Sequence, residues 1–193
     1  TLQGTVTGSI TATITESTAA TVTGLTGTGN AFTIALTEDT LDADAIVDIA
    51  ATTTETITIT SADGGQIING TATNILSVVN GDFTGIQDDF ASTASGNTSV
   101  ANANLLNAAT TGIVTATINE TDIDTLATLT ASDNNLLTIV VSDRDATATE
   151  LNTIADATNG AGRLIDFSAV ETVTGTLAGV NTLLVTNEAE FTA

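Results

Sequence analysis

The sequence predicts an α/β repeat solenoid in which parallel strands alternate with short helices. A ten-residue stretch at 70–79 returns at 175–184: both copies begin Gly-Thr and, after three further residues, read apolar, any residue, hydroxyl, apolar, apolar. Strand-like apolar runs also recur at intervals of about 25 residues, a length from which solenoids are built. These runs begin near Ile10, Phe32 and Ile57, and again near Ile113, Leu137 and Leu164.

Further matches support a long repeat of 104 or 105 residues: 10–17 with 114–121, and 33–38 with 138–143. We therefore divide the chain into a first long repeat at 1–104 and a second, incomplete repeat at 105–193. Ala193 corresponds to Asp88 of the first copy, so the second copy stops before its own end. We expect either a truncated array or a longer chain that continues the pattern.

Hydrophobic periodicity predicts the elements of the first copy. Alternation over residues 5–14 indicates a half-buried strand, and the Thr- and Gly-rich residues 15–30 are predicted to form turns. Strands are predicted at 32–36 and 57–59. Between them we expect a helix capped by Thr37, because Leu41, Ala45, Ile46 and Ile49 recur at helical spacing. The Gly-Thr stretch is predicted to be a short helix that ends by Asn80.

The second copy is predicted to follow an irregular segment at 81–98. A helix is expected at 99–110, with Val100, Leu105 and Ala109 in one apolar stripe. The remaining predictions are strands at 114–118, 137–141 and 164–167, and helices at 123–129, 146–157 and 175–185.

The predicted core consists of small aliphatic side chains. The chain contains five Phe and no Trp, Tyr, Met, Cys or Pro. Such a composition suits a narrow core that is repeated many times. The positions predicted to be buried are Phe32, Ile34, Leu36, Ile46, Ile49, Ile139, Val141, Leu151 and Ile154.

Strands that alternate with helices imply parallel pairing through crossovers, which favours the α/β solenoid. Thr is a weak helix former, so helices of this composition must be held by packing. The alternative is an all-β solenoid in which the predicted helices are loops or further strands.

Charge and composition exclude several classes of function. The net charge is −21, and Arg144 and Arg163 are the only cations. Nucleic-acid binding is therefore not expected, because phosphate neutralisation needs Lys and Arg. No apolar run is long enough to insert into a membrane. The chain has no His and no Cys, which removes the usual triads and thiolate or imidazole metal sites. We expect a protein that is not an enzyme.

The cofactor prediction is none, with calcium as a possibility. Hard cations bind carboxylate and carbonyl oxygens, which the Gly-, Asn- and Asp-rich turns of this chain supply. The candidate calcium ligands are Asp63, Asp82, Asp143 and Asp145. The competing interpretation is that these residues only form turns, since none matches a known calcium loop.

Three Asn residues fit the acceptor pattern for N-glycosylation: Asn69, Asn97 and Asn119. Chains rich in Thr and Asn produce such triplets by chance, so the pattern makes these residues candidates only.

Residues 142–158, SDRDATATELNTIADAT, and residues 169–184, AVETVTGTLAGVNTLL, carry a resemblance to a known family. They are similar to the repeats of the giant cell-surface proteins of cyanobacteria. The match is best over residues 138–185 and weaker over 33–80. The resemblance implies an extracellular, non-enzymatic structural role at the cell surface, and it carries over no catalytic residue.

Together these observations predict a cell-surface repeat module that forms or extends a fibre or surface layer. Its expected partners are copies of itself, end to end, or neighbouring repeats of the same chain. One alternative is an adhesin module that binds calcium or glycan, although a glycan site usually presents Trp or Tyr, and this chain has neither. Another is a polysaccharide-active β-helix enzyme with carboxylates stacked in one groove.

Overall fold

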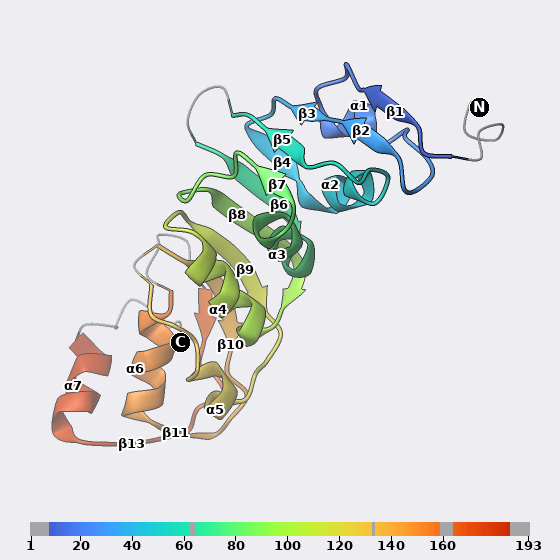
Figure 1. Cartoon of the computed structure of the whole chain (residues 1–193). Helices are drawn as coiled ribbons and strands as arrows, with labels where there is room; N and C mark the ends of the chain where they lie inside the picture. The colour runs from blue at the N-terminus through green and yellow to red at the C-terminus, as the bar shows by residue number, and fades with distance from the viewer. Residues whose placement is uncertain (1–7, 62–64, 133, 159–163, 186–193) are drawn as a thin grey trace. The chain divides into compact units, whose positions relative to one another are not determined.

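The chain folds as a mixed α/β protein with parallel strands, as predicted (Figure 1). The structure, a computed structural model, describes residues 8–61, 65–132, 134–158 and 164–185. It contains two compact units, Thr1–Ser92 and Thr93–Ala193. The boundary predicted between the long repeats, at 104/105, falls inside a helix of the second unit.

In unit 1 the strands pair in parallel as β1 with β2, β4 with β6, and β5 with both β3 and β7. The elements are β1 Thr11–Thr13, α1 Ala19–Val22, β2 Ala31–Thr33, β3 Ala35–Leu36, β4 Thr40–Asp42, α2 Ala43–Ala50, β5 Ile57–Ile59, β6 Ile67–Thr71, α3 Ala72–Asn80 and β7 Phe83–Thr84.

In unit 2 the strand β10 pairs in parallel with β9 and β12, and β11 pairs in parallel with β13. The elements are β8 Ala91–Thr98, whose first two residues belong to unit 1, α4 Val100–Ala109, β9 Val114–Ile118, α5 Ile123–Leu126, β10 Leu136–Val140, β11 Asp145–Thr147, α6 Ala148–Asp156, β12 Leu164–Asp166, β13 Thr172–Thr174 and α7 Leu177–Val185.

The strand registers repeat with the period of the sequence. In unit 1, Thr40 of β4 lies opposite Ile67 of β6. In unit 2, Asp145 of β11 lies opposite Thr172 of β13, and both positions are 105 residues further along the chain. The helices that follow these strands, α3 and α7, also begin 105 residues apart. The sequence repeat therefore corresponds to repeated secondary structure and repeated pairing.

Gly70 and Gly175 occupy equivalent places at the entry of α3 and α7, as predicted. A Cβ atom added to Gly70 would lie 3.1 Å from the Cβ of Ala43, and one added to Gly175 would lie 2.9 Å from the Cβ of Ala148. Ala43 and Ala148 are the first residues of α2 and α6, 105 residues apart. Both glycines therefore let the strand pass close to the start of the preceding helix. Gly70 also has φ +146°, which a side chain would strain.

All nine positions predicted to be buried are buried. Ile34 and Ile139 are each 1% exposed, and Leu36, Ile46, Leu151 and Ile154 are 0% exposed. The largest fully buried side chain is Phe90, at the start of β8. Each layer of the core is thus thin and mainly aliphatic, as the composition suggested.

Two boundaries in the first copy differ from the prediction. The segment predicted as turns contains the helix α1. The helix predicted to start after Thr37 begins instead at Ala43, because residues 40–42 first form β4 and Asp42 is the N-cap. The Asp42 Oδ1 atom accepts from Asp44 N at 3.0 Å and from Ala45 N at 3.2 Å.

Two predictions around α4 were wrong. The segment at 81–98, predicted to be irregular, contains β7 and the eight-residue strand β8. The buried residues of α4 are Val100, Ala103 and Leu106, whereas Leu105 is 56% exposed. Ser99 is the N-cap of α4, so the helix begins at Val100. With this start, Ala103 and Leu106 face the core, where Leu105 and Ala109 were predicted.

Acidic residues from the next strand region cap several helices. A Glu38 carboxylate oxygen accepts from Ala19 N, Glu120 Oε2 accepts from Val100 N at 3.0 Å, and Asp143 Oδ2 accepts from Ile123 N at 2.7 Å. Each acid lies 19 or 20 residues after the helix that it caps. The first amides of a helix have no partner inside it and carry partial positive charge, so a carboxylate stabilises them. The one-turn helices α1 and α5 depend most on such contacts.

Asp44 forms a comparable link from α2 to the start of α3. Its Oδ1 atom accepts from Thr71 N at 3.0 Å, from Thr71 Oγ1 at 3.1 Å and from Asn74 Nδ2 at 2.7 Å. The hydrogen bond from the Thr71 backbone, followed by that from Asn74, lowers the pKa of the Asp44 carboxyl below its usual value.

We predict that Ile139→Ala destabilises the fold by about 2–5 kcal/mol, because it leaves a cavity beneath β10. Val140→Ala is the matched control, since Val140 is the next residue of the same strand and is 43% exposed. Denaturant unfolding measures both variants. A loss below about 0.5 kcal/mol for Ile139→Ala, within the range of ordinary surface substitutions, would contradict its place in the core.

We predict that Asp44→Asn lowers stability most at neutral pH. A carboxyl whose folded pKa is depressed stabilises the fold above its unfolded pKa and loses that contribution as pH falls through the folded value. The difference in unfolding free energy between wild type and Asp44→Asn should therefore shrink below about pH 4. Asp48→Asn removes the same charge from an exposed position of α2 and serves as control. A difference that stays constant from pH 7 to pH 3 would contradict the link.

Candidate functional site

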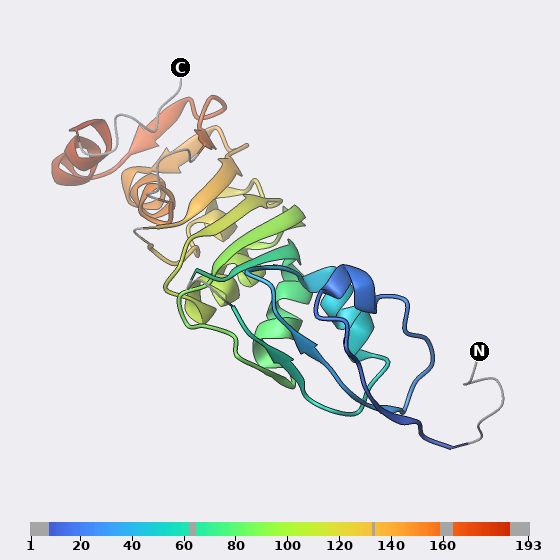
Figure 2. The ribbon, with the colours of Figure 1, turned by 90° about the horizontal axis from the view of Figure 1, so that it is seen from above.

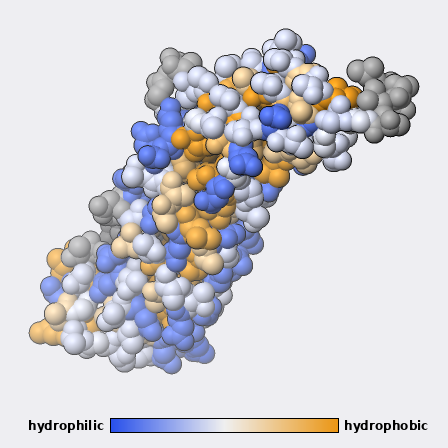
Figure 3. All heavy atoms as spheres, in the orientation of Figure 1, coloured by the Kyte–Doolittle hydropathy of each residue, from blue (hydrophilic) through white to orange (hydrophobic). Residues whose placement is uncertain are grey.

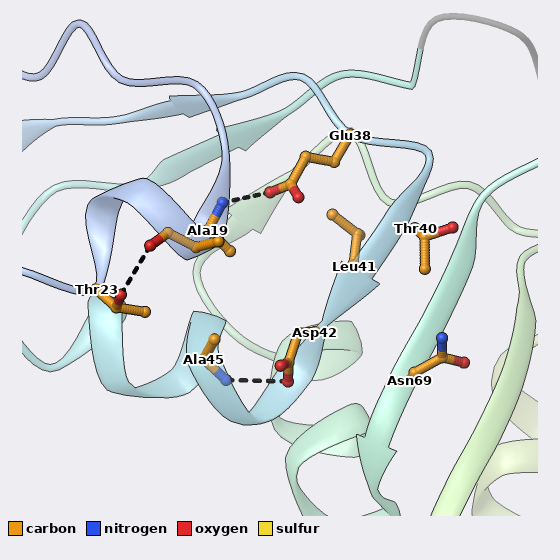
Figure 4. A pocket seen from close by; sticks show the side chains of 9 residues that line it. Ala19, Thr23, Glu38, Thr40, Leu41, Asp42, Ala45 and Asn69 are labelled. Atoms are coloured by element: carbon orange, nitrogen blue, oxygen red, sulfur yellow. Dashed lines mark hydrogen bonds between the residues drawn. The ribbon is translucent and has the colours of Figure 1, made fainter.

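A pocket opens in unit 1 between α1 and the corner where β4 turns into α2. Its volume is about 500 Å³. Figure 4 shows its walls, with Glu38 directed to the start of α1 and Asp42 directed to Ala45. The lining residues are Ala19, Ala20, Thr23, Glu38, Thr40, Leu41, Asp42, Ala45 and Asn69.

A pocket of about 370 Å³ occupies the equivalent place in unit 2, beside α5, β11 and α6. Asp143, Asp145 and Thr174 line it 105 residues after Glu38, Thr40 and Asn69 of the first pocket. Ile123 likewise corresponds to Ala19 at a distance of 104 residues. The chain therefore builds one kind of pocket twice.

Helix length explains both pockets. The helices α1 and α5 have four residues each, whereas the helices against which they pack, α2 and α6, have eight and nine. A single helical turn covers only part of a longer neighbour, so the corner beside it stays open. The carboxylates of Glu38 and Asp143 reach from the pocket wall to the first amides of the short helices.

The two pockets differ in charge. The first has two carboxylates, Glu38 and Asp42, whereas four acidic residues line the second: Asp124, Asp143, Asp145 and Glu150. No Lys, Arg or His lines either pocket among the described residues. Arg144 lies beside Asp145 in the chain, but its guanidinium pairs with Glu171 at 2.5 Å. The second pocket is consequently the more acidic of the two.

Two of the four carboxylates in the second pocket already accept hydrogen bonds. Asp143 caps α5, and Glu150 Oε2 accepts from Thr147 N and Thr147 Oγ1, each at 2.8 Å. Thr147 Oγ1 in turn accepts from Glu150 N at 3.2 Å, which completes a capping box. These bonds fix the two side chains, and each carboxylate keeps lone pairs for a further ligand.

The first pocket contains an unusual polar atom. The Oδ1 atom of Asn69 is buried and has no hydrogen-bond partner, although the residue as a whole is half-buried. A buried carbonyl without a partner costs free energy, so a bound donor or cation would relieve it.

The structure separates the four predicted calcium ligands. Asp143 and Asp145 line one pocket, where Asp124 and Glu150 join them. Asp82 is exposed at the turn between α3 and β7. Asp63 lies outside the described residues. In the part of the chain that the structure describes, no three acidic side chains approach closely enough to form a ready metal site.

The glycosylation candidates also differ in accessibility. Asn97, near the end of β8, and Asn119, after β9, are exposed. Asn69 is half-buried in β6, which makes it the least accessible of the three.

The sequence analysis did not identify Glu38, Asp124 or Glu150 as members of a pocket. Local motifs could not reveal them, because each comes from a different element. The signal that could have found them is the 105-residue offset, which aligns Glu38 with Asp143 and hence one pocket with the other.

The last strand–helix pair, β13–α7, exposes apolar side chains that its counterpart buries. Val173 is 41% exposed and Leu177 is 88% exposed, whereas the residues 105 positions earlier, Ile68 and Ala72, are 0% and 5% exposed. Leu184 and Val185 are exposed as well, and apolar surface is visible at the α7 end in Figure 3. Among the described residues β13 pairs only with β11.

Within the described ranges, no helix combines the length and the apolar character needed to cross a bilayer. Comparison of the chain with protein-family models, with curated proteins and with solved structures finds no match. The candidate functional features of the described residues are the two pockets and the exposed face of β13–α7.

Proposed function

We propose that this chain is a segment of an extracellular, cell-surface structural protein that is not an enzyme. In this proposal its strand–helix pairs stack as an α/β solenoid, and the solenoid extends end to end into a fibre or surface layer. The observation that carries the proposal is a contrast between equivalent positions: Ile68 and Ala72 of β6–α3 are buried, whereas Val173 and Leu177 of β13–α7 are exposed.

The exposure of Val173 and Leu177 indicates what would cover the β13–α7 face: a further strand–helix pair. In each of these ladders the two paired strands lie 20 to 27 residues apart in the chain. The exposed β13–α7 face has the same alternation of strand and helix as the inner pairs, so a further strand–helix pair is complementary to it. Terminal repeats of a solenoid normally need a polar cap, and β13–α7 presents Leu177 and Leu184 instead.

Charge and edge chemistry agree with end-to-end growth. With a net charge of −21, side-by-side contact is opposed by repulsion, whereas contact at the apolar end is opposed less. Free strand edges are usually protected by Lys or Pro, and this chain has neither. Head-to-tail contacts that do not close into a ring produce filaments.

We predict that purified chains associate end to end, more strongly in salt or calcium, and that Leu177→Asp abolishes the association. The substitution places a charge where an apolar contact would form. Leu105→Asp is the matched control, because Leu105 is an exposed helical leucine on α4. Light scattering and electron microscopy give the readout.

Wild type and Leu105→Asp should form filaments, and Leu177→Asp should remain monomeric. A wild-type chain that stays monomeric at high concentration, with and without calcium, would contradict the assembly. Equal association of all three chains would contradict the role of the β13–α7 face.

A second candidate function, calcium binding as in an adhesin module, is favoured by the acidic pocket of unit 2. Asp143 and Asp145 were selected from the sequence alone, and they line this pocket together with Asp124 and Glu150. Calcium takes six to eight oxygen ligands in flexible geometry, and the threonines of the pocket could add hydroxyl oxygens to the carboxylates. Thr172 and Thr174, both exposed, supply them from β13.

We predict that calcium raises the melting temperature of the chain and binds with a Kd of about 10⁻⁴–10⁻³ M, the range of extracellular modules. Asp145→Asn should weaken binding roughly tenfold, because the number of charged ligands sets the affinity. Asp82→Asn removes one exposed carboxylate outside the pocket and is the control. Calorimetric titration measures the calcium affinity of both variants. Equal effects of Asp145→Asn and Asp82→Asn would contradict a calcium site in the pocket, because nonspecific charge screening would then explain both.

A further inference from the structure

A regular array of exposed threonines covers one face of unit 1. We define the threonine array as Thr11 and Thr13 of β1, Thr33 of β2, Thr58 and Thr60 at β5, and Thr84 of β7. All six are exposed. Their strand neighbours Phe32, Ile57 and Ile59 are buried, and Ala12 and Phe83 are half-buried, so the strands alternate between a more buried and an exposed side.

Two Thr–Thr pairs of the array lie in register on neighbouring strands, and Ala31 and Ala35 lie opposite Thr11 and Thr58. Thr13 lies opposite Thr33, and Thr58 lies opposite Thr84. Ile34 alone separates β2 from β3 in the chain, and Ala35 of β3 pairs with Thr58 of β5. The β2–β3 segment therefore joins the pair β1–β2 to the strands β5 and β7; this part of the chain runs from blue to green in Figure 2. Thr84 Oγ1 and Thr58 Oγ1 are 3.4 Å apart, which shows that the hydroxyls of neighbouring strands approach each other.

The face is uncharged in a strongly acidic chain. The outward positions of the paired residues in β1, β2, β3, β5 and β7 are all Thr or Ala. Unit 1 nevertheless contains many Asp and Glu residues, which lie in turns and at helix ends. The array therefore presents only hydroxyl and methyl groups, without the tightly held hydration shell of a carboxylate.

The spacing of such an array is set by the sheet. Neighbouring strands lie about 4.8 Å apart, and residues i and i+2 of one strand lie about 6.7 Å apart. Thr is β-branched, so its χ1 is restricted and little side-chain entropy is lost when the array binds a ligand. Each hydroxyl can donate one hydrogen bond and accept two, which is also the chemistry of a water oxygen. The array thus resembles a rigid two-dimensional lattice of water-like groups separated by methyl groups.

We propose that the threonine array binds the ordered water lattice at the surface of ice. Water oxygens at an ice surface form an ordered lattice, and they both donate and accept hydrogen bonds, as the Thr hydroxyls do. The methyl groups lie between the hydroxyls and favour water that is already ordered around them. This function is separate from end-to-end assembly, because the array lies on β1, β2, β5 and β7, whereas the assembly contrast rests on β13–α7.

The test measures how much of the full chain enters a slowly growing ice hemisphere and how strongly it slows ice recrystallisation. Thr58→Tyr places a bulky side chain in the middle of the array, and Tyr is a good strand former, so folding should be kept. Thr117→Tyr is the matched control, since Thr117 is an exposed residue of β9 that lies outside the array, the two pockets and the β13–α7 face. Circular dichroism checks that each variant is folded, and Thr33→Tyr is a second blocking variant if Thr58→Tyr does not fold.

Wild type and Thr117→Tyr should be incorporated into the ice and should slow recrystallisation, and Thr58→Tyr and Thr33→Tyr should lose both effects. Exclusion of the wild-type chain from the ice, as for an ordinary dissolved protein, would overturn the proposal. The wild-type chain would also be excluded from the ice if a second copy of the chain covered the threonine array. Retention of both effects in a folded array variant, or their loss in Thr117→Tyr, would also overturn the proposal.

Discussion

Parallel pairing between strands 20 to 27 residues apart is the constraint on which the rest of this structure depends. A parallel connection has to cross over, and here the crossover is a short helix or an extended corner. The helix must start close to the next strand, which explains why Gly70 and Gly175 lie against Ala43 and Ala148. The buried residues of the described chain are mainly Ile, Leu, Val and Ala, with few large aromatic residues.

The acidic composition also has a structural use. Glu38, Glu120 and Asp143 each cap a helix that precedes them by 19 or 20 residues, and Asp44 connects α2 to Thr71 and Asn74. A carboxylate at a helix start compensates for the weak helix propensity of Thr-rich segments. Part of the charge therefore holds successive strand–helix pairs together. The remainder gathers in turns, at helix ends and in the pocket of unit 2, and leaves the threonine face neutral.

Period and hydrophobic pattern were sufficient to predict the α/β class, the equivalence of Gly70 and Gly175, and the buried aliphatic positions. The pattern missed α1, because its single turn is held by Glu38, which lies 19 residues later. It missed β8, because the buried side chains of that strand include Ser92, Ala94 and Thr98 and no large aliphatic residue. The pockets were missed for a related reason: their acids come from separate elements that only the folded chain brings together.

In the solenoid that we propose, β13–α7 is an inner strand–helix pair that lacks its next neighbour. The most direct test extends the chain so that a copy of residues 81–109 follows Val185, and measures hydrogen exchange of the α7 amides. The account predicts slower exchange in α7 and a higher melting temperature than in the chain of 193 residues, because Leu177 and Leu184 become covered. Unchanged exchange in α7, with the added segment itself exchanging freely, would contradict it.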